Sequence, residues 1–356
     1  MDSAQYSPFR RKLVAWYIDR ARDLPWRRTT DPYRIWISEI MLQQTTVVAV
    51  IPYFERFLER FPTVNDLAVA AESDVLRLWE GLGYYSRARN IHRAANAIVE
   101  RYAGAFPADL KTLQLLPGIG RYTAGAIASF AFDRRAPIVE ANTLRLYSRL
   151  LGYDGDPRSS EGQQELWSFA EAILPRTAPG RLNQALMELG ATVCTPREPR
   201  CESCPVRTHC RAFRDGTQTT IPRPKPKAAI TAVTEASIAI RMGSKFLLRR
   251  RSSKERWAGL WDFIRFEIER DAKTVSVPQL VESVKERTGL SVELGHQVVE
   301  LKHGVTRYRI TLKCFTAIKI RGRLKSSEEW EWVEPANFDK YPLSVTARQF
   351  AERLKR

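Results

Sequence analysis

Long apolar runs are absent from this sequence. No stretch of its 356 residues approaches the roughly 18 consecutive apolar residues of a membrane-spanning helix, which excludes a membrane protein of that kind. The first 22 residues mix charged and apolar side chains and contain no uninterrupted apolar core like that of a secretory signal. Internal repeats are absent as well. We therefore expect a protein that is neither membrane-inserted nor secreted and that works in the cytoplasm.

Acidic residues are the scarcer of the two charged classes. Lysine and arginine number 57 against 40 aspartates and glutamates, a net charge of +17, with 44% hydrophobic residues. Residues 1–213 carry a net charge of +5 and residues 214–356 a net charge of +12. The composition is that of a globular protein long enough for two domains, and a strongly basic surface favours a polyanionic partner such as nucleic acid.

The spacing of apolar residues changes along the chain. The first part predicts a mostly α-helical region, with helices near residues 34–44, 47–61, 74–79, 86–102, 122–132, 143–151, 163–173 and 183–193. The second part predicts a smaller α+β region, with strands near 232–240, 246–250, 290–300, 306–318 and 330–333 and helices near 278–287 and 346–354. We therefore predict domains at 1–213 and 230–356.

A proline- and lysine-rich segment at 214–229 is predicted to link the two domains. Prolines alternate there with basic residues, which removes backbone donors and favours an extended path. The basic residues either lie along a phosphate backbone or belong to a solvent-exposed spacer without a binding role, and the sequence leaves both interpretations open.

Cysteine is rare and clustered. Four of the five cysteines, Cys194, Cys201, Cys204 and Cys210, fall within 17 residues, whereas Cys314 lies in a strand pattern typical of a core. Without an export signal, clustered thiols indicate metal ligands rather than disulfides. Structural zinc sites usually pair two C-x2-C knuckles, whereas a single short loop with four cysteines suits a 4Fe–4S cluster. Four arginines flank the loop and either contact phosphate or offset the charge of the metal site: Arg197, Arg200, Arg207 and Arg211.

A glycine hairpin lies between two predicted helices, in Leu116-Pro117-Gly118-Ile119-Gly120-Arg121. The preceding segment is not a strand, so the pattern is a helix–hairpin–helix rather than a dinucleotide-binding turn. Gly118 and Gly120 let backbone N–H groups approach an anion, and the following helix adds its dipole. Such a hairpin either holds a DNA phosphate without reading bases or is only a tight helix connection.

Two acidic residues are candidates for proton and charge chemistry. Glu39 lies beside Ile40 and Met41 on a predicted helix, where apolar surroundings raise the pKa of a carboxyl and make it a proton donor. Glu140 precedes a predicted helix start, where the dipole favours the ionised form. Each residue taken alone also fits an ordinary structural glutamate.

These features together resemble the MutY-type adenine DNA glycosylases of the endonuclease III-like helix–hairpin–helix superfamily. The cysteine spacing and the hairpin mark the superfamily. The adenine-specific branch is marked by Leu24-Pro25-Trp26-Arg27, Glu39-x-Met41-Leu42-Gln43-Gln44-Thr45 and Trp79-Glu80-Gly81-Leu82-Gly83-Tyr84-Tyr85-Ser86-Arg87. The segment Trp257-Ala258-Gly259-Leu260-Trp261 resembles the start of the family's Nudix-like domain. The resemblance covers nearly the whole chain.

The resemblance implies a base-excision-repair enzyme with one 4Fe–4S cluster, held by residues 194–210. Its implied substrate is double-stranded DNA in which adenine is mispaired with 8-oxoguanine or guanine. The adenosine is flipped into a pocket because a duplex buries its bases. Because one chain holds all of these parts, we expect a monomer, and we expect it to be associated with the DNA of the nucleoid.

The resemblance assigns roles to individual residues. Glu39 matches the acid that protonates adenine N7 and later activates water, Glu140 stands at the position of the sugar-side carboxylate, and Tyr122 and Asn142 support that carboxylate. Four residues match the adenine pocket: Trp26, Arg27, Val47 and Gln184. Four more match residues that wedge into the helix around the opposite base: Gln44, Thr45, Leu82 and Tyr84. Bifunctional relatives carry lysine where this chain has Tyr122, and tyrosine cannot form a Schiff base, so we expect no strong strand-cleaving activity.

The chain departs from the family pattern at three places. The sugar-side acid is normally aspartate followed by glycine, whereas here Glu140 precedes Ala141. Of the family's lesion-sensing Phe-Ser/Thr-His motif, this chain retains only His303, with Lys302 before it. Lys302 is a candidate for a phosphate contact, and His303 is either a lesion-sensing residue or a structural histidine. The helix 278–287 lacks the glutamate cluster of catalytic Nudix domains, which predicts a lesion reader. The alternatives are a weakened or inactive DNA-binding homologue, an endonuclease III-like pyrimidine glycosylase and a zinc-dependent regulator.

Overall fold

The computed structural model describes residues 3–223, 229–268, 276–326 and 329–355. The chain divides into two compact units. The helical unit comprises Met1–Val69 and Asn90–Pro226, and the sheet unit comprises Ala70–Arg89 and Lys227–Arg356. Part of the predicted linker, residues 224–228, lies outside the described residues, and the predicted domain boundaries stay a prediction.

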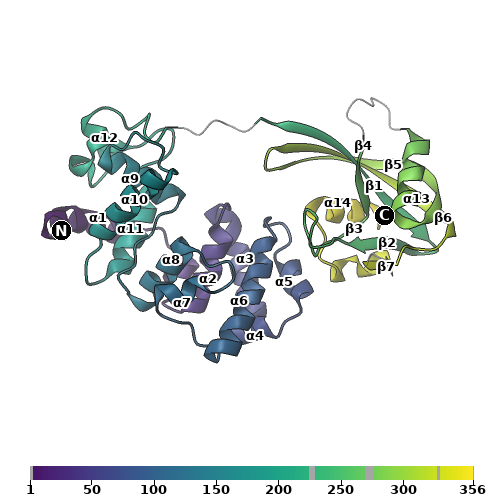
Figure 1. The fold of residues 1–356 in the computed structure, drawn as a ribbon, viewed down its shortest axis with the longest axis horizontal. Helices are drawn as coiled ribbons and strands as arrows, with labels where there is room; N and C mark the ends of the chain where they lie inside the picture. The colour runs from purple at the N-terminus through teal and green to yellow at the C-terminus, as the bar shows by residue number, and fades with distance from the viewer. Residues whose placement is uncertain (1–2, 224–228, 269–275, 327–328, 356) are drawn as a thin grey trace. The chain divides into compact units, whose positions relative to one another are not determined.

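The helical unit confirms the predicted α-helical region (Figure 1). Its helices are α1 (Ser7–Arg20), α2 (Pro32–Leu42), α3 (Val47–Arg60), α4 (Val64–Ala68), α7 (Leu110–Gln114), α8 (Arg121–Phe132), α9 (Ala141–Leu151), α10 (Ser160–Ala172), α11 (Pro179–Thr192) and α12 (Arg211–Arg214), with α6 (Ser86–Tyr102) shared between the units. The prediction did not include α1, α4, α7 or α12. Helices α4 and α7 have five residues each, which is too short for a repeating apolar period.

Nearly all of helix α2 is buried, because it lies in the interior of the helical unit. Pro32 starts the helix, and the Asp31 carboxylate caps it by accepting a hydrogen bond from the Tyr33 N–H. Trp36, Ile37 and Met41 are fully buried. A helix that is buried all round also buries its polar residues, which places the Glu39 side chain in the interior.

One helix boundary differs from the prediction. Helix α2 ends at Leu42 rather than at Gln44, and Gln44 adopts a left-handed backbone with φ of 58°. The helical pattern of apolar residues continues into this turn, so periodicity alone did not reveal the end of the helix.

The glycine hairpin connects α7 to α8, which confirms a helix on each side of it. Gly118 has φ of +76°, and a Cβ at this position would lie 2.6 Å from Cβ of Asn90. A side chain is therefore excluded by both the backbone conformation and the space. Gly120 is the N-cap of α8, and its N-terminal N–H groups receive no side-chain cap.

The sheet unit contains a seven-stranded sheet between two helices. Its strands are β1 (Thr231–Met242), β2 (Lys245–Arg250), β3 (Trp261–Asp262), β4 (Ile264–Ile268), β5 (Leu290–Val305), β6 (Tyr308–Gly322) and β7 (Glu329–Val333). The order is β3-β2-β1-β6-β5, with β4 paired to β1 and β7 to β2, and only β1 and β6 run parallel among these pairs.

Alternating side chains of the sheet face two separate cores. Ala239 and Phe246 pack with Phe350 of α14 (Val345–Leu354), whereas Ile238 and Leu247 pack with residues of α13 (Val277–Thr288). Since successive strand residues point to opposite faces, the two helices cover opposite faces of the sheet. The predicted α+β region is confirmed, and β3 and β4 are additions to it.

Lys302 and His303 fall between the two strands predicted near 290–300 and 306–318, but in the structure they lie within a strand. Strand β5 continues beyond Glu300 to Val305, and Lys302 and His303 pair in register with Thr311 and Ile310 of β6. Cys314 is fully buried on β6, as its strand pattern predicts.

The segment Ala70–Arg89 belongs to the sheet unit through charged contacts. It includes α5 (Glu72–Leu78), and the Arg348 guanidinium of α14 binds the Glu80 carboxylate with distances of 2.8 and 2.9 Å. A second pair joins Arg250 and Glu72 at 3.8 Å. Glu80 lies two residues before Leu82, so α14 contacts the chain beside the predicted wedge residues.

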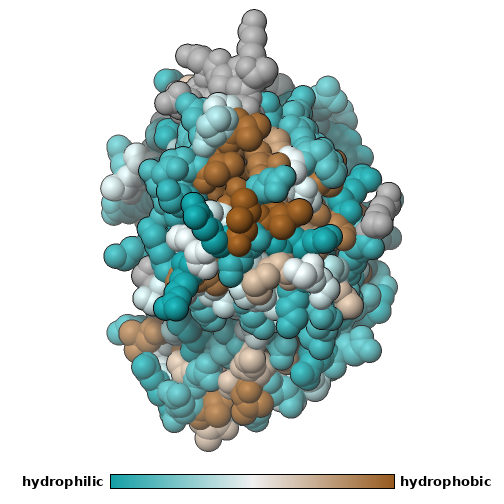
Figure 2. Space-filling view, turned by 90° about the vertical axis from the view of Figure 1, so that its right-hand side faces the viewer, coloured by the Kyte–Doolittle hydropathy of each residue, from teal (hydrophilic) through white to brown (hydrophobic). Residues whose placement is uncertain are grey.

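The face drawn in Figure 2 is largely hydrophilic but carries exposed apolar groups. Figure 2 shows apolar residues gathered on the face that it draws. Exposed large apolar side chains of the sheet unit include Met242, Ile318 and Ile320. None of the helices that the structure describes is both long enough and apolar enough to cross a membrane.

Candidate active site and candidate metal centre

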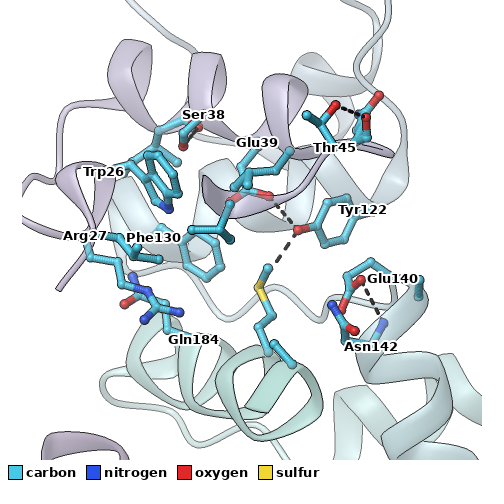
Figure 3. Close-up of a pocket in the computed structure, with 18 of the residues that line it drawn as sticks. Trp26, Arg27, Ser38, Glu39, Thr45, Tyr122, Phe130, Glu140, Asn142 and Gln184 are labelled. Carbon is cyan, nitrogen blue, oxygen red and sulfur yellow. Dashed lines mark hydrogen bonds between the residues drawn. The ribbon is translucent and has the colours of Figure 1, made fainter. Parts of the chain in front are cut away.

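A cavity of about 720 Å³ in the helical unit collects ten of the predicted site residues. They come from the segment before α2, from α2 and the turn after it, and from α3, α8, α9 and α11. These residues are Trp26, Arg27, Glu39, Gln44, Thr45, Val47, Tyr122, Glu140, Asn142 and Gln184. Figure 3 shows Trp26, Arg27 and Gln184 on one side and Glu140 and Asn142 on the other, with Glu39 and Tyr122 between them.

Glu39 is a buried carboxyl, and among the described residues a single side chain donates a hydrogen bond to it. It is 4% exposed, and the Tyr122 hydroxyl donates a hydrogen bond to Oε2 at 2.5 Å. Burial raises the pKa of Glu39 to about 7, while the hydrogen bond from Tyr122 opposes that rise. A carboxyl with this pKa exists in both protonation states near neutral pH, so it can donate a proton and later accept one.

Tyr122 is the second residue of α8 and faces Glu39 across the cavity. Burial, followed by the charges of Glu39 and Glu140, raises the pKa of its phenol well above the usual range, so the hydroxyl stays neutral. The Met187 sulfur lies 3.9 Å from that hydroxyl. Tyr122 is therefore placed to hold the Glu39 carboxyl rather than to attack a substrate.

Glu140 is the N-cap of α9, and both of its carboxylate oxygens bind that helix. Oε2 accepts from the Asn142 N–H at 2.8 Å and Oε1 from the Thr143 N–H at 2.9 Å, while the Thr143 hydroxyl accepts from the Glu140 N–H at 2.8 Å. Burial raises the pKa of Glu140 despite these two backbone bonds. The prediction that the helix start favours the ionised form is thus opposed by desolvation, which is the larger effect.

Asn142 connects the cavity to the cysteine loop. Its Oδ1 accepts a hydrogen bond from Nη2 of Arg145 at 3.0 Å. Arg145 also donates to the carbonyl oxygens of Gly190 and Cys194, at 2.7 and 2.8 Å. Asn142 is therefore held in place by an arginine that also contacts the first cysteine of the loop.

The other end of the cavity is formed around a buried ion-pair cluster that the sequence analysis missed. Glu188 is completely buried, and its carboxylate accepts from Arg22 at 2.7 and 2.8 Å and from Arg27 at 2.7 Å. Burial opposes its ionisation, but the hydrogen bonds from Arg22 and Arg27 outweigh burial and lower the pKa of Glu188 to about 2. The available signal was the spacing of Gln184 and Glu188, which are four residues apart on one face of α11.

Two more contacts orient the residues at that end. The Tyr17 hydroxyl donates to Oε1 of Gln184 at 2.7 Å, which leaves the amide nitrogen of Gln184 as the group available to a ligand. Trp26 is buried and packs edge-to-face on Phe54 with ring centres 5.4 Å apart. This end of the cavity thus combines an aromatic wall with oriented donors.

The remaining predicted DNA-contacting residues lie outside this cavity. Gly118 and Gly120 form the hairpin, Leu82 is buried, and Tyr84 is 46% exposed with φ of 49°. The Lys302 side chain is 79% exposed. His303 is half-buried, with Nε2 3.2 Å from the Arg265 guanidinium and its ring 6.0 Å from that of Trp257. In this conformation only Tyr84 of the two wedge residues of the sheet unit presents its side chain to solvent.

The four clustered cysteines line a second cavity of the helical unit. Cys194, Cys201, Cys204 and Cys210 all contribute to it, together with Arg149. Burial raises the pKa of the Cys204 thiol to about 12 and also raises that of Cys210. Within the described residues, no three His, Cys, Asp or Glu side chains are grouped as ligands of a single metal ion. Four thiolates are the ligand set of both a structural zinc site and a 4Fe–4S cluster, so these residues could hold either metal centre.

Comparisons with known proteins match both parts of the chain. Residues 37–172 match the model of the HhH-GPD superfamily base excision DNA repair proteins, and residues 236–353 match that of the NUDIX domain. An adenine DNA glycosylase of Buchnera aphidicola from Schizaphis graminum is 38% identical over 260 residues, which cover 73% of this chain and 75% of the relative. The rat adenine DNA glycosylase is 47% identical over 222 residues, which cover 60% of this chain. The chain spans 43% of the length of that rat relative.

Solved structures resemble the helical part. A thermostable thymine-DNA glycosylase matches with a TM-score of 0.55 and 29% identity, over 60% of this chain and all of that one. A trapped covalent intermediate of endonuclease III with DNA matches with a TM-score of 0.52 and 24% identity, over 61% of this chain and 99% of that one. The second likeness concerns the fold alone.

Proposed function

The chain belongs to the adenine DNA glycosylase family, and we propose that it excises adenine mispaired with 8-oxoguanine or guanine in double-stranded DNA. The observation that carries this proposal is that Glu39 and Glu140 line the same cavity and that the pKa of Glu39 is raised to about 7. The curated name of the relatives and a net charge of +17 support DNA as the substrate.

Cleavage of the N-glycosidic bond needs an acid for the base and an anion for the sugar. A flipped adenosine enters the cavity because its target bond is inaccessible inside a duplex. Neutral Glu39 gives its proton to N7 as the C1′–N9 bond breaks and the bonding electrons leave with adenine. The Glu140 carboxylate stabilises the positive sugar, as in glycosidases that use two carboxylates. Water then adds to C1′ and returns a proton to Glu39, which completes the hydrolysis.

Tyr122 supports a monofunctional enzyme. Cleavage of the DNA strand through a Schiff base requires an amine that attacks C1′. The described residues that line the cavity include no lysine, and Tyr122 is engaged with Glu39. The product is therefore an abasic site in an unbroken strand.

The four cysteines would hold one 4Fe–4S cluster, a structural group that braces the loop between α11 and α12. The common cavity of the four cysteines, which are all partly buried, supports this assignment. The sheet unit would read the base opposite adenine through the region of Lys302 and His303, and α13 offers only Glu282 and Glu286 where catalytic Nudix domains carry more. We further propose that the protein acts as a monomer on nucleoid DNA.

A second candidate is a DNA-binding homologue with little or no excision activity. The observation in its favour is that both Glu140 oxygens already bind the start of α9. Each oxygen retains a lone pair, so the carboxylate can still face a cation. Activity therefore remains the leading proposal.

A single-turnover assay separates the two candidates. Purified protein is mixed with duplexes that carry adenine opposite 8-oxoguanine, guanine or cytosine, and the strand is analysed with and without alkali. Alkali-dependent cleavage opposite 8-oxoguanine and guanine is expected, with none in a Glu39→Gln control. Binding without excision would instead establish the DNA-binding homologue, and cleavage without alkali would refute the monofunctional assignment.

A further inference from the structure

Arg149 is a buried cation at the wall of the cysteine cavity. It lies on α9 and is 2% exposed, and each of the three nitrogens of its guanidinium donates at least one hydrogen bond. Nη1 donates to the Cys194 sulfur at 3.3 Å and to the Thr195 carbonyl at 2.7 Å. Nη2 donates to the Pro196 carbonyl at 3.1 Å, and Nε donates to the Ile221 carbonyl at 2.8 Å.

These partners satisfy the hydrogen bonds of Arg149 but leave its charge without a carboxylate. A buried guanidinium without an opposite charge is strongly unfavourable, because burial removes the solvation of the ion. Three of its four acceptors are neutral carbonyls, and no described carboxylate pairs with it. The Cys194 sulfur is the acceptor that becomes negative, since a thiol loses its proton when it binds a metal.

The arginines in and beside the cysteine loop differ in their surroundings from Arg149, which lies on α9. Arg207 pairs with Glu202 and Arg211 with Asp215, and the side chains of both arginines are at least 43% exposed. Arg197 is exposed to solvent. Water screens such surface charges, so their removal has little effect on a buried group.

We propose that Arg149 is the buried counter-charge of the iron–sulfur cluster and that its hydrogen bond to Cys194 sets the reduction potential and the retention of that cluster. This inference rests on the cluster proposed above. Four thiolates give a 4Fe–4S centre a net negative charge, and hydrogen bonds to its sulfurs are among the factors that set its potential. A nearby cation favours the more reduced, more negative form, so Arg149 raises the potential and slows oxidative loss of iron.

The residue also links two separate parts of the chain to that sulfur. The same guanidinium binds Thr195 and Pro196 beside the first cysteine and Ile221 after α12. The Cys210 sulfur lies 3.4 Å from the Arg149 carbonyl oxygen. Arg149 thus contacts both ends of the loop that surrounds the cluster.

The test uses the full chain and three variants: Arg149→Gln, Arg149→Lys and, as a matched control, Arg197→Gln. Iron and sulfide content, the midpoint potential and the rate of bleaching by an oxidant are measured for each. For Arg149→Gln we expect bleaching about tenfold faster and a midpoint potential more negative by about 59 mV, which is a tenfold change in the one-electron equilibrium. Arg149→Lys should lie between that variant and the wild type, and Arg197→Gln should match the wild type.

The outcomes separate this inference from the cofactor itself. A wild-type chain without iron overturns the proposed cluster and the role of Arg149 with it. Variants that carry the cluster with unchanged potential and bleaching rate overturn the role of Arg149 alone. If Arg149→Gln does not fold, pulsed electron paramagnetic resonance of wild-type protein labelled with 15N-arginine gives the answer. A nitrogen coupling to the oxidised cluster that Arg149→Lys abolishes supports the contact, and its absence in the wild type refutes it.

Discussion

Removal of the charge of Glu140, without a change in its size, provides the sharpest test of the site. Glu140→Gln replaces a carboxylate that accepts two backbone N–H bonds with an amide that has only one acceptor oxygen. One N–H at the start of α9 then loses its partner, and the sugar cation loses its anion. Stability and catalysis are therefore both affected, and each effect has its own magnitude.

The loss of stability follows from the capping bonds. Removal of an N-cap costs roughly 0.5–2 kcal/mol, with typical values of about 1. For a unit of this size, a change of 1 kcal/mol lowers the melting temperature by about 2–4 °C. Glu140→Gln should therefore remain folded and show a small decrease in melting temperature.

The loss of activity follows from the missing charge. Removal of one preorganised electrostatic partner of a transition state costs roughly 10²–10³ in rate, or about 2.7–4 kcal/mol. We expect the single-turnover excision rate constant of Glu140→Gln to fall by that factor. Thr143→Ala is the matched control, because it removes the hydroxyl of the capping box but keeps the carboxylate.

Glu140→Asp tests the position of the carboxylate. The present side chain turns back to the N–H groups of Asn142 and Thr143, the second and third residues of α9, which are the groups that an aspartate N-cap also reaches. We therefore expect Glu140→Asp to excise adenine within about tenfold of the wild type, since a displacement of 1 Å would cost about 10²-fold. Wild-type activity in Glu140→Gln would refute a role for the charge, and a 10²-fold loss in Glu140→Asp would refute the shared position.

Three further predictions follow from contacts of single residues. Tyr122→Phe removes the hydrogen bond that lowers the pKa of Glu39, so the decline in excision rate that begins near pH 7 should move to higher pH; an unmoved or lower pH limb would contradict the assignment. Glu188→Gln removes the counter-charge of Arg22 and Arg27, whose side chains are 39% and 15% exposed, and should lower the free energy of unfolding by roughly 1–3 kcal/mol in a denaturant titration. The exposed Glu171→Gln should cost less than about 1 kcal/mol. Because the pKa of Glu188 is lowered, its stabilisation is complete above its ordinary pKa and is lost as the pH falls towards 2. Lys302→Ala should reduce the slope of log affinity against log salt by about 1 if this exposed side chain binds phosphate, and an unchanged slope would exclude that contact.

The sequence by itself determined much of the architecture. Helical spacing up to residue 193 and β-branched alternation after residue 230 predicted the two kinds of structure, because both periodicities are local properties of the chain. The spacing of Cys194, Cys201, Cys204 and Cys210 placed four sulfurs in one short loop. The motifs around Glu39 and Tyr122 identified residues that the fold brings into one cavity.

Other features depended on which distant residues come together. The proton affinity of Glu39 arises from burial of α2 and from a tyrosine on another helix, and neither is visible in the residues around position 39. The role of Glu188 is visible only in the tertiary structure, because its partners Arg22 and Arg27 are more than 160 residues away in the sequence. Strand β5 extends through Lys302 and His303 because β6 pairs with it along that whole length.

Arg149 is the simplest example of the difference between what the sequence predicts and what the tertiary structure decides. The sequence places an arginine on an amphipathic helix, where a solvated side chain is the ordinary expectation. The tertiary structure instead buries it between Cys194 and Ile221, which lie 45 and 72 residues further along the chain. Local sequence determined which segments become helices, strands and cysteine loops, whereas burial and ion pairing, which act between distant segments, decided the protonation and the partners of the groups within them.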